Sequence, residues 1–148
     1  MVSGSGVTPT SVWSAGEAGA DGGHAGVESG HIDITIPFTE PHQTVQFRFT
    51  LPYFTDFTGR TLKARVRRGP GIGQGGVQPF VQSTESWEWV SGTWSRFSEL
   101  TELTDVTLDF DTATDPTIVK RFGIQIHSGT EPGTFETTHV SIDSIRIE

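Results

Sequence analysis

The chain has 148 residues, no cysteine and a formal net charge of −8 at pH 7. This length suits one domain with its own hydrophobic core, and the absence of cysteine excludes a disulfide framework and thiol chemistry. The negative charge argues against nucleic acid as a partner, because proteins that track phosphates usually carry the opposite sign. No stretch approaches the apolar length of a membrane span, so we expect no membrane partner.

The first residues, MVSGSG, have the composition of a flexible Gly/Ser spacer. We expect residues 1–9 to be a linker remnant outside the fold and residues 10–148 to form a single domain. Such a spacer indicates a module from a longer chain, whose secretion signal would lie elsewhere. A short first strand is predicted around residues 10–13, followed by a long glycine-rich loop at 14–26.

Alternation of apolar and polar residues, the pattern of a half-buried strand, recurs along most of the chain. No window shows a helical period over three turns, and turn clusters rich in glycine and proline separate the alternating segments. Many short strands of this kind predict an all-β fold, either a sandwich or a barrel. The phase changes near Asp143–Ser144, which predicts a β-bulge in the last strand. The predicted strands are HIDITIP (31–37), TVQFRFT (44–50), TLKARVRR (61–68), VQPFVQS (77–83), DVTLDFD (105–111), FGIQIHS (122–128) and THVSIDSIRIE (138–148).

Patterns that would indicate catalysis are weak. Asp109 and Asp111 have a spacing that could bring together the two carboxylates of a retaining glycosidase, but they stand where a strand leads into a turn. Glu85 and Glu88 would fall on opposite faces of an extended chain. No nucleophile motif occurs, the histidines lack zinc-binding spacing, and Tyr53 is the only tyrosine available as a lyase base. We therefore expect no catalytic residues, with a small β-sandwich glycosidase or polysaccharide lyase as the alternative.

Four acidic residues are candidates for binding calcium through hard oxygen ligands. Glu17, Asp21 and Glu28 lie in the early glycine-rich region, and Asp143 interrupts the last strand. The first and last strands of a sandwich are often neighbours, so these carboxylates could meet and hold a calcium ion that stabilises the loop. The alternative is that all four are simply exposed.

Three of the four tryptophans fall within eight residues, next to a strand rich in glutamine. Aromatic rings stack on the apolar faces of sugars, and amides form hydrogen bonds with hydroxyl groups. In the strand at 77–83, valine and proline fill one side, so we expect the opposite side to be exposed and to bind carbohydrate. The alternative is that the rings point inward as core, as we expect for Trp13 and Trp94 unless they line a rim. The candidate carbohydrate-binding residues are Gln78, Phe80, Gln82, Trp87 and Trp89, with Gln125 and His127 from the polar face of another strand.

Several short segments, in their order along the chain, resemble the β-sandwich carbohydrate-binding modules attached to secreted bacterial mannanases, xylanases and endoglucanases. The segments are FTGRTLKARVRR, GGVQPFVQS, WEWVSGTW, VTLDF, VKRFGIQIHSG and VSIDSIRIE. The resemblance implies a jelly-roll sandwich of two antiparallel sheets, without catalysis, that binds a polysaccharide on a concave sheet or at loop tips. It also implies a structural calcium with Asp143 as the ligand on the last strand, and Trp87 and Trp89 as binding residues.

These observations lead us to expect a secreted, monomeric, non-catalytic module. It would bind mannan, xylan or a β-glucan and target a parent glycoside hydrolase in the same longer chain. The long segment GEAGADGGHAG departs from the family's pattern and leaves the ligands of the calcium open. A purely structural sandwich domain is a further alternative.

Overall fold

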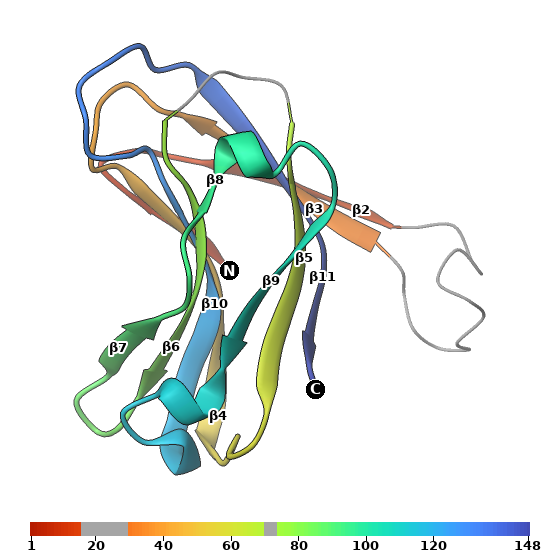
Figure 1. The fold of residues 1–148 in the computed structure, drawn as a ribbon, viewed down its shortest axis with the longest axis vertical. Helices are drawn as coiled ribbons and strands as arrows, with labels where there is room; N and C mark the ends of the chain where they lie inside the picture. The colour runs from red at the N-terminus through yellow and green to blue at the C-terminus, as the bar shows by residue number, and fades with distance from the viewer. Residues whose placement is uncertain (16–29, 70–73) are drawn as a thin grey trace.

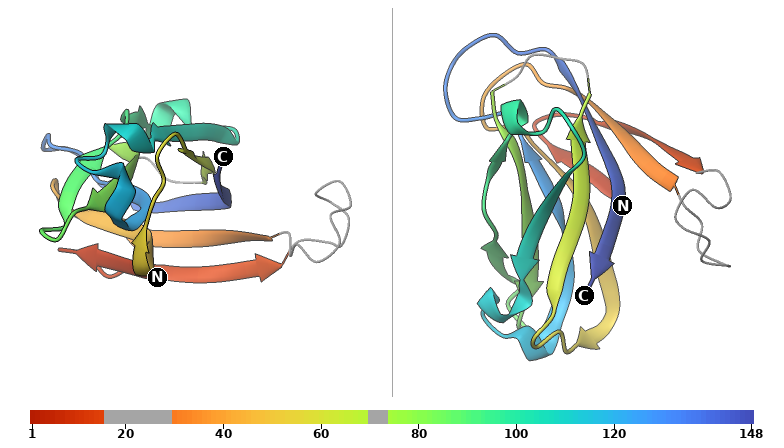
Figure 2. Two further views of the ribbon diagram at one scale, coloured as in Figure 1. Left: turned by 90° about the horizontal axis from the view of Figure 1, so that it is seen from below. Right: turned by 45° about the vertical axis from the view of Figure 1, so that its right-hand side comes forward.

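The computed structural model describes residues 1–15, 30–69 and 74–148. In this part of the chain, two antiparallel sheets pack face to face, and their two layers can be followed in Figures 1 and 2. The predicted all-β sandwich is therefore confirmed. Each predicted strand segment forms a strand, because the alternation places one side of it against the facing sheet.

The larger sheet has the strand order β1–β4–β10–β6–β7, and β8 also pairs with β6. The β10 strand lies at its centre, between β4 and β6, and pairs with both along most of its length. Its strands are β1 (Val2–Ser5), β4 (Thr44–Thr55), β6 (Gly76–Ser83), β7 (Glu88–Ser91), β8 (Ser95–Arg96) and β10 (Val119–His127).

The smaller sheet has the order β2–β3–β11–β5–β9, so the last strand pairs with both β3 and β5. Three short 3-10 turns lie at the ends of the sandwich: η1 near the upper end of Figure 1, and η2 and η3 at the lower end. The strands are β2 (Thr10–Ala15), β3 (Gly30–Pro37), β5 (Thr61–Arg68), β9 (Thr104–Asp109) and β11 (Thr137–Ile147). The 3-10 turns are η1 (Phe97–Glu99), η2 (Phe110–Thr112) and η3 (Pro116–Ile118).

The core between the sheets consists of two clusters of buried apolar side chains. The larger cluster is mostly isoleucine and valine from both sheets, with Phe97 and Leu100 at one end. The smaller cluster surrounds Phe110, which is fully buried beside Phe122 and Leu62. Each buried side chain of this size contributes about 1.5–3 kcal/mol relative to exposure, so this interface holds the sheets together.

The expectation for residues 1–9 is wrong. Val2–Ser5 forms the edge strand β1 and pairs with β4, with Val2 opposite Phe47. The backbone N–H of Arg48 also donates to the carbonyl of Met1 at 2.9 Å. A Ser/Gly-rich segment is flexible in isolation, but here it pairs with polar groups that the edge of β4 would otherwise leave open.

The predicted bulge in the last strand is confirmed. The pairing of β11 with β5 shifts between Ile142 and Ser144, so Asp143 is the extra residue. On the other side of β11, the residue before the bulge, Ile142, pairs with Ile32 of β3. Asp143 therefore lies near the end of the sheet where β2 stops and β3 begins. The predicted first strand is also confirmed as β2, while the predicted loop that follows falls largely at 16–29, outside the described residues.

No helix in the described part of the chain is both long enough and apolar enough to cross a membrane.

Candidate functional site

The outward face of the larger sheet carries rows of polar and aromatic side chains across four strands. Their core-facing neighbours, such as Val45, Val77 and Ile124, are fully buried, so strand alternation directs these side chains away from the core. In one row, Gln125 stands opposite both Gln46 and Gln78. We call this surface the outward strip. Its members are Gln46, Arg48, Gln78, Gln82, Trp89, Arg121 and Gln125.

The glutamines of the strip are held in place by hydrogen bonds. The Nε2 group of Gln78 donates to Oε1 of Gln125 at 2.6 Å. The Nε2 group of Gln82 donates to the carbonyl of Trp87 at 3.0 Å, and Oε1 of Gln82 accepts from Nη1 of Arg121 at 3.2 Å. Since amide orientation is already set, these groups present donors and acceptors without a large entropic cost of ordering.

Phe80 shares the side of β6 that carries Gln78 and Gln82, as predicted, but the expectation that it is exposed is wrong. Its side chain is fully buried. It belongs to neither core cluster; instead the ring of Trp89 lies over it, with ring centres 4.1 Å apart and planes inclined by 12°. Phe80 is therefore the base on which Trp89 is stacked, rather than a contact surface.

Trp87 and Trp89 are both exposed, by 38% and 37%, as the sequence predicts for binding residues. Only Trp89 lies on a strand; Trp87 belongs to the turn between β6 and β7, and its φ is 58°. The two tryptophans therefore do not share one extended segment. The positive φ turns the chain sharply, and the ring of Trp87 lies beside the guanidinium of Arg121, 4.7 Å from ring centre to Cζ.

A second aromatic group adjoins the strip at Trp87, in the turn between β6 and β7. This turn lies at the lower end of the sandwich in Figure 1. The ammonium of Lys120 lies 4.6 Å from the ring centre of Phe54 and 4.8 Å from that of Trp87. Tyr53 is 81% exposed beside them. The hollow here is lined by Leu51, Pro52, Tyr53, Phe54, Trp87 and Lys120.

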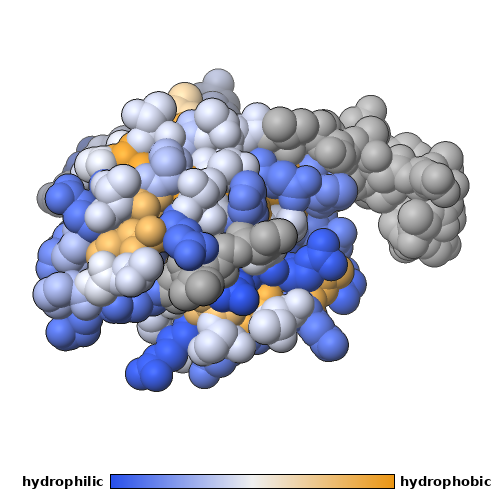
Figure 3. Space-filling view, turned by 90° about the horizontal axis from the view of Figure 1, so that it is seen from above, coloured by the Kyte–Doolittle hydropathy of each residue, from blue (hydrophilic) through white to orange (hydrophobic). Residues whose placement is uncertain are grey.

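At the opposite end of β10, His127 and Trp94 line another hollow. The two rings meet edge to face with centres 5.7 Å apart, and Nδ1 of His127 accepts the backbone N–H of Gly129 at 2.8 Å. Burial, and to a lesser degree the nearby His42, lowers the pKa of His127, so its imidazole is neutral at pH 7 and carries its proton on Nε2. The upper end of the sandwich, seen in Figure 3, presents mostly hydrophilic residues with small apolar areas. Trp94 is half-buried and lines this hollow. It therefore lies at a rim, which was one of the two positions expected for it, the other being the core.

The acidic pair considered for glycoside hydrolysis is engaged in turns. An Oδ1 atom of Asp109 accepts the backbone N–H of Asp111 at 3.0 Å, and Oδ1 of Asp111 accepts the N–H of Gly59 at 2.8 Å. These contacts cap the 3-10 turn η2 and tie it to the turn before β5. Both carboxylates thus have structural partners that explain their presence.

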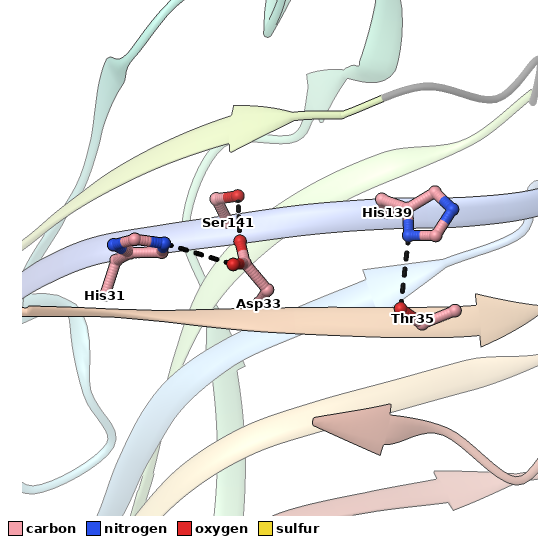
Figure 4. A network of polar contacts seen from close by, with 5 residues as sticks. All are labelled: His31, Asp33, Thr35, His139 and Ser141. Carbon is pink, nitrogen blue, oxygen red and sulfur yellow. Dashed lines mark hydrogen bonds and ion pairs between the residues drawn. The ribbon is translucent and has the colours of Figure 1, made fainter. Parts of the chain in front are cut away.

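A serine, an aspartate and two histidines lie on the outer side of the smaller sheet (Figure 4). Asp33 accepts hydrogen bonds from the hydroxyl of Ser141 and from Nε2 of His31, the latter at 3.0 Å. His139 instead contacts Thr35, at 3.1 Å. A nucleophilic triad requires the imidazole to receive the proton of the serine, whereas here the serine hydroxyl points to the carboxylate.

Several residues of the strip and of the aromatic group beside it were not predicted. They are Gln46, Arg48 and Arg121 of the strip, and Phe54 and Lys120 of the aromatic group. Gln46 and Arg48 could have been found from the sequence, because the alternation of residues 44–50 places them on the polar side of their strand. For Phe54 the strand had to be followed beyond its predicted end, since β4 continues to Thr55. Lys120 and Arg121 precede the predicted start of β10, where the pairing shifts register.

Of the predicted calcium ligands, Asp143 is exposed at the bulge of β11. Glu17, Asp21 and Glu28 lie outside the described residues. Within the ranges that the structure describes, no group of three acidic or histidine side chains could hold a metal ion. The described residues therefore supply one candidate ligand for calcium.

Residues 8–144 match the sequence profile of a family described as mannanase, galactose-binding domain-like. The chain belongs to this family. The match includes every residue of the outward strip and extends from before β2 into β11. No protein with a curated description matches the chain.

Solved structures share the fold of this family member at low sequence identity. One comes from a study of promiscuous specificity in carbohydrate-binding modules of the β-sandwich superfamily; its TM-score is 0.69 at 21% identity. That match covers 100% of this chain and 56% of the other, so the chain spans little more than half of that structure. The resemblance to β-sandwich carbohydrate-binding modules is thus confirmed in family and fold.

Two further structures contain bound oligosaccharides. The family 11 carbohydrate-binding module from Clostridium thermocellum, in complex with a β-1,3-1,4-mixed-linked tetrasaccharide, has a TM-score of 0.53 at 8% identity; the match covers 98% of this chain and 85% of that one. Xylanase10C from Cellvibrio japonicus, in complex with xylopentaose, has a TM-score of 0.50 at 17% identity and coverages of 91% and 26%.

Proposed function

We propose that this protein is a non-catalytic carbohydrate-binding module that binds a β-linked plant cell-wall polysaccharide on the outward strip. The observation that carries the proposal is the exposed ring of Trp89, stacked on buried Phe80 and flanked by hydrogen-bonded glutamines. In this arrangement a flat apolar surface adjoins oriented amide groups, which suits the faces and hydroxyl groups of a sugar chain.

The strip has the length for several sugar units. Between Lys120 and His127, β10 extends over roughly 23 Å at the usual rise per residue. Phe54 and Trp87 lie at the Lys120 end of this length, and Trp94 lies at the His127 end. Trp89 lies beside the middle, over Phe80. Stacking contributes about 0.5–1.5 kcal/mol per ring beyond the area it buries, so several rings would act together.

The substrate class is also supported by the comparisons. The family's description refers to a mannanase, and two neighbours hold xylopentaose and a β-1,3-1,4-mixed-linked tetrasaccharide. By analogy, the parent chain would carry a glycoside hydrolase and would be secreted to reach its polysaccharide. We expect modest affinity, because desolvation of polar groups and ordering of a flexible chain oppose binding on an open surface.

The proposal is tested by electrophoresis through gels containing mannan, xylan or mixed-linked β-glucan, with a polysaccharide-free gel as control. We expect strong retardation in at least one polymer and no release of reducing or unsaturated sugars on incubation. Unchanged mobility in all three gels would contradict the proposal and favour a purely structural domain. Product release would favour the enzymatic alternative.

We also propose that a calcium ion stabilises the end of the smaller sheet at Asp143. The bulge exposes this carboxylate near Ala15 and Gly30, the residues that flank the segment containing the other acidic candidates. Calcium takes oxygen ligands from carboxylates and backbone carbonyls, so it would fix this segment to the last strand.

Chelation is therefore expected to lower the melting temperature by about 5 °C or more, because an ion that binds only the folded state stabilises it by mass action. Asp143→Ala should remove this sensitivity, whereas the control Asp105→Ala, on β9, should retain it. The measurement is thermal unfolding with and without a chelator, with added calcium as a rescue. An equal melting temperature in both conditions for the parent protein would contradict the calcium proposal.

A further inference from the structure

The outward strip is positively charged, although the protein as a whole is acidic. The formal net charge is −8, yet the strands β4, β6 and β10 together contain no aspartate or glutamate. They carry Arg48, Lys120 and Arg121 on or next to the strip. A cationic surface on a chain of the opposite overall sign indicates a local role for these charges.

Among the described residues, the side chains of the two arginines form hydrogen bonds with neutral groups. Nε and Nη1 of Arg121 donate to Thr50 at 3.0 Å and to Gln82 at 3.2 Å. Nη1 of Arg48 donates to Gln46 at 3.3 Å, and Nε of Arg48 is buried with no hydrogen-bond partner in the described part of the chain.

The ion pairs found among the described residues do not involve either arginine. They are His31–Asp33, Lys63–Asp105, Arg65–Asp105 and Lys120–Glu85. Lys120 is thus balanced by Glu85, at 3.8 Å, whereas the two guanidinium groups have no counter-charge among these residues.

Both arginines face the same part of the strip. Arg48 stands opposite Gly123, and Arg121 lies two residues before that glycine, opposite Thr50. Side chains in such a diagonal relation are roughly 7–8 Å apart at their bases. Partial burial and the charge of Arg48 both lower the pKa of Arg121, in that order of size. These two like charges are partly removed from water, and no described residue supplies a stabilising anion for them.

We propose that Arg48 and Arg121 bind the carboxylate of a uronic acid unit, so that the preferred ligand is an acidic β-linked polysaccharide. This inference rests on the proposed function and specifies its substrate class. A guanidinium group is planar and donates in pairs, which matches a carboxylate better than isolated hydroxyl groups. The adjoining rings of Trp87 and Trp89 would hold the sugar that carries this group.

The test compares glucuronoxylan with the same polymer after chemical reduction of its carboxyl groups, by isothermal titration calorimetry. We expect at least tenfold tighter binding to the native polymer, and a loss of most of this difference at about 0.5 M sodium chloride, where charges are strongly screened.

Arg48→Gln and Arg121→Gln remove the charge while keeping a hydrogen-bonding group. Each should reduce affinity for the native polymer about tenfold while changing affinity for the reduced polymer by no more than about threefold. Retained binding of the reduced polymer shows that a variant is folded. Arg67→Gln is the matched control, because Arg67 is an exposed arginine of β5 in the smaller sheet.

Equal affinity for the native and reduced polymers would overturn the inference and leave the proposed function in place. Unchanged binding of both arginine variants would also overturn it. If the protein bound none of the polysaccharides, neutral or acidic, the proposed function itself would fail.

Discussion

Replacing Trp89 with alanine is expected to weaken polysaccharide binding about tenfold or more. The substitution removes the exposed ring that lies 4.1 Å above Phe80 and uncovers that phenylalanine to water. The site would lose its flat apolar surface beside Gln82, which stands opposite Trp89 in the pairing of β6 with β7. Affinity electrophoresis and calorimetry with the retained polymer measure the effect.

The control for this substitution is Leu103→Ala. Leu103 is an exposed apolar side chain next to β9 in the smaller sheet, so its removal should leave retention unchanged. If Trp89→Ala were retained as strongly as the parent protein, the binding surface would have to lie elsewhere on the sandwich.

Replacing Phe80 with alanine is expected to cost about 3–5 kcal/mol in the free energy of unfolding, as for other fully buried aromatic side chains. It should also weaken binding by the folded protein, because Trp89 loses the ring on which it is stacked. Urea denaturation gives the stability, and calorimetry under conditions where the variant remains folded gives the affinity.

Phe110→Ala separates these two effects. Phe110 is equally buried but belongs to the core cluster around Phe122, away from the strip. A similar loss of stability is expected, with little change in affinity. Equal loss of affinity in both variants would show that general destabilisation, rather than support of Trp89, accounts for the result.

The local pattern of the strands was predicted well, because alternation depends only on neighbouring residues. In β5, Leu62, Ala64 and Val66 are fully buried, as their spacing indicates. The bulge at Asp143 was found in the same way, from a break in that period. Such signals do not depend on knowing which strands pair.

Predictions that required a partner strand were less successful. Phe80 lies on the predicted side, but its burial depends on Trp89 arriving from β7 and covering it. Arg48 and Arg121 come from distant segments and become neighbours only through the register of β4 with β10. The exclusion of residues 1–9 failed for the same reason, since the strand Val2–Ser5 is defined by its pairing with β4.

By itself, the sequence determined the all-β class, the faces of the strands and the residue types that suit a sugar ligand. The tertiary structure alone decided which of the outward residues remain accessible and which support others, such as Trp89 above Phe80. It also decided that an acidic chain has an acid-free, arginine-bearing strip. The physical reason is that side-chain direction follows from local backbone geometry, whereas coverage and charge balance depend on contacts between strands that are far apart in the chain.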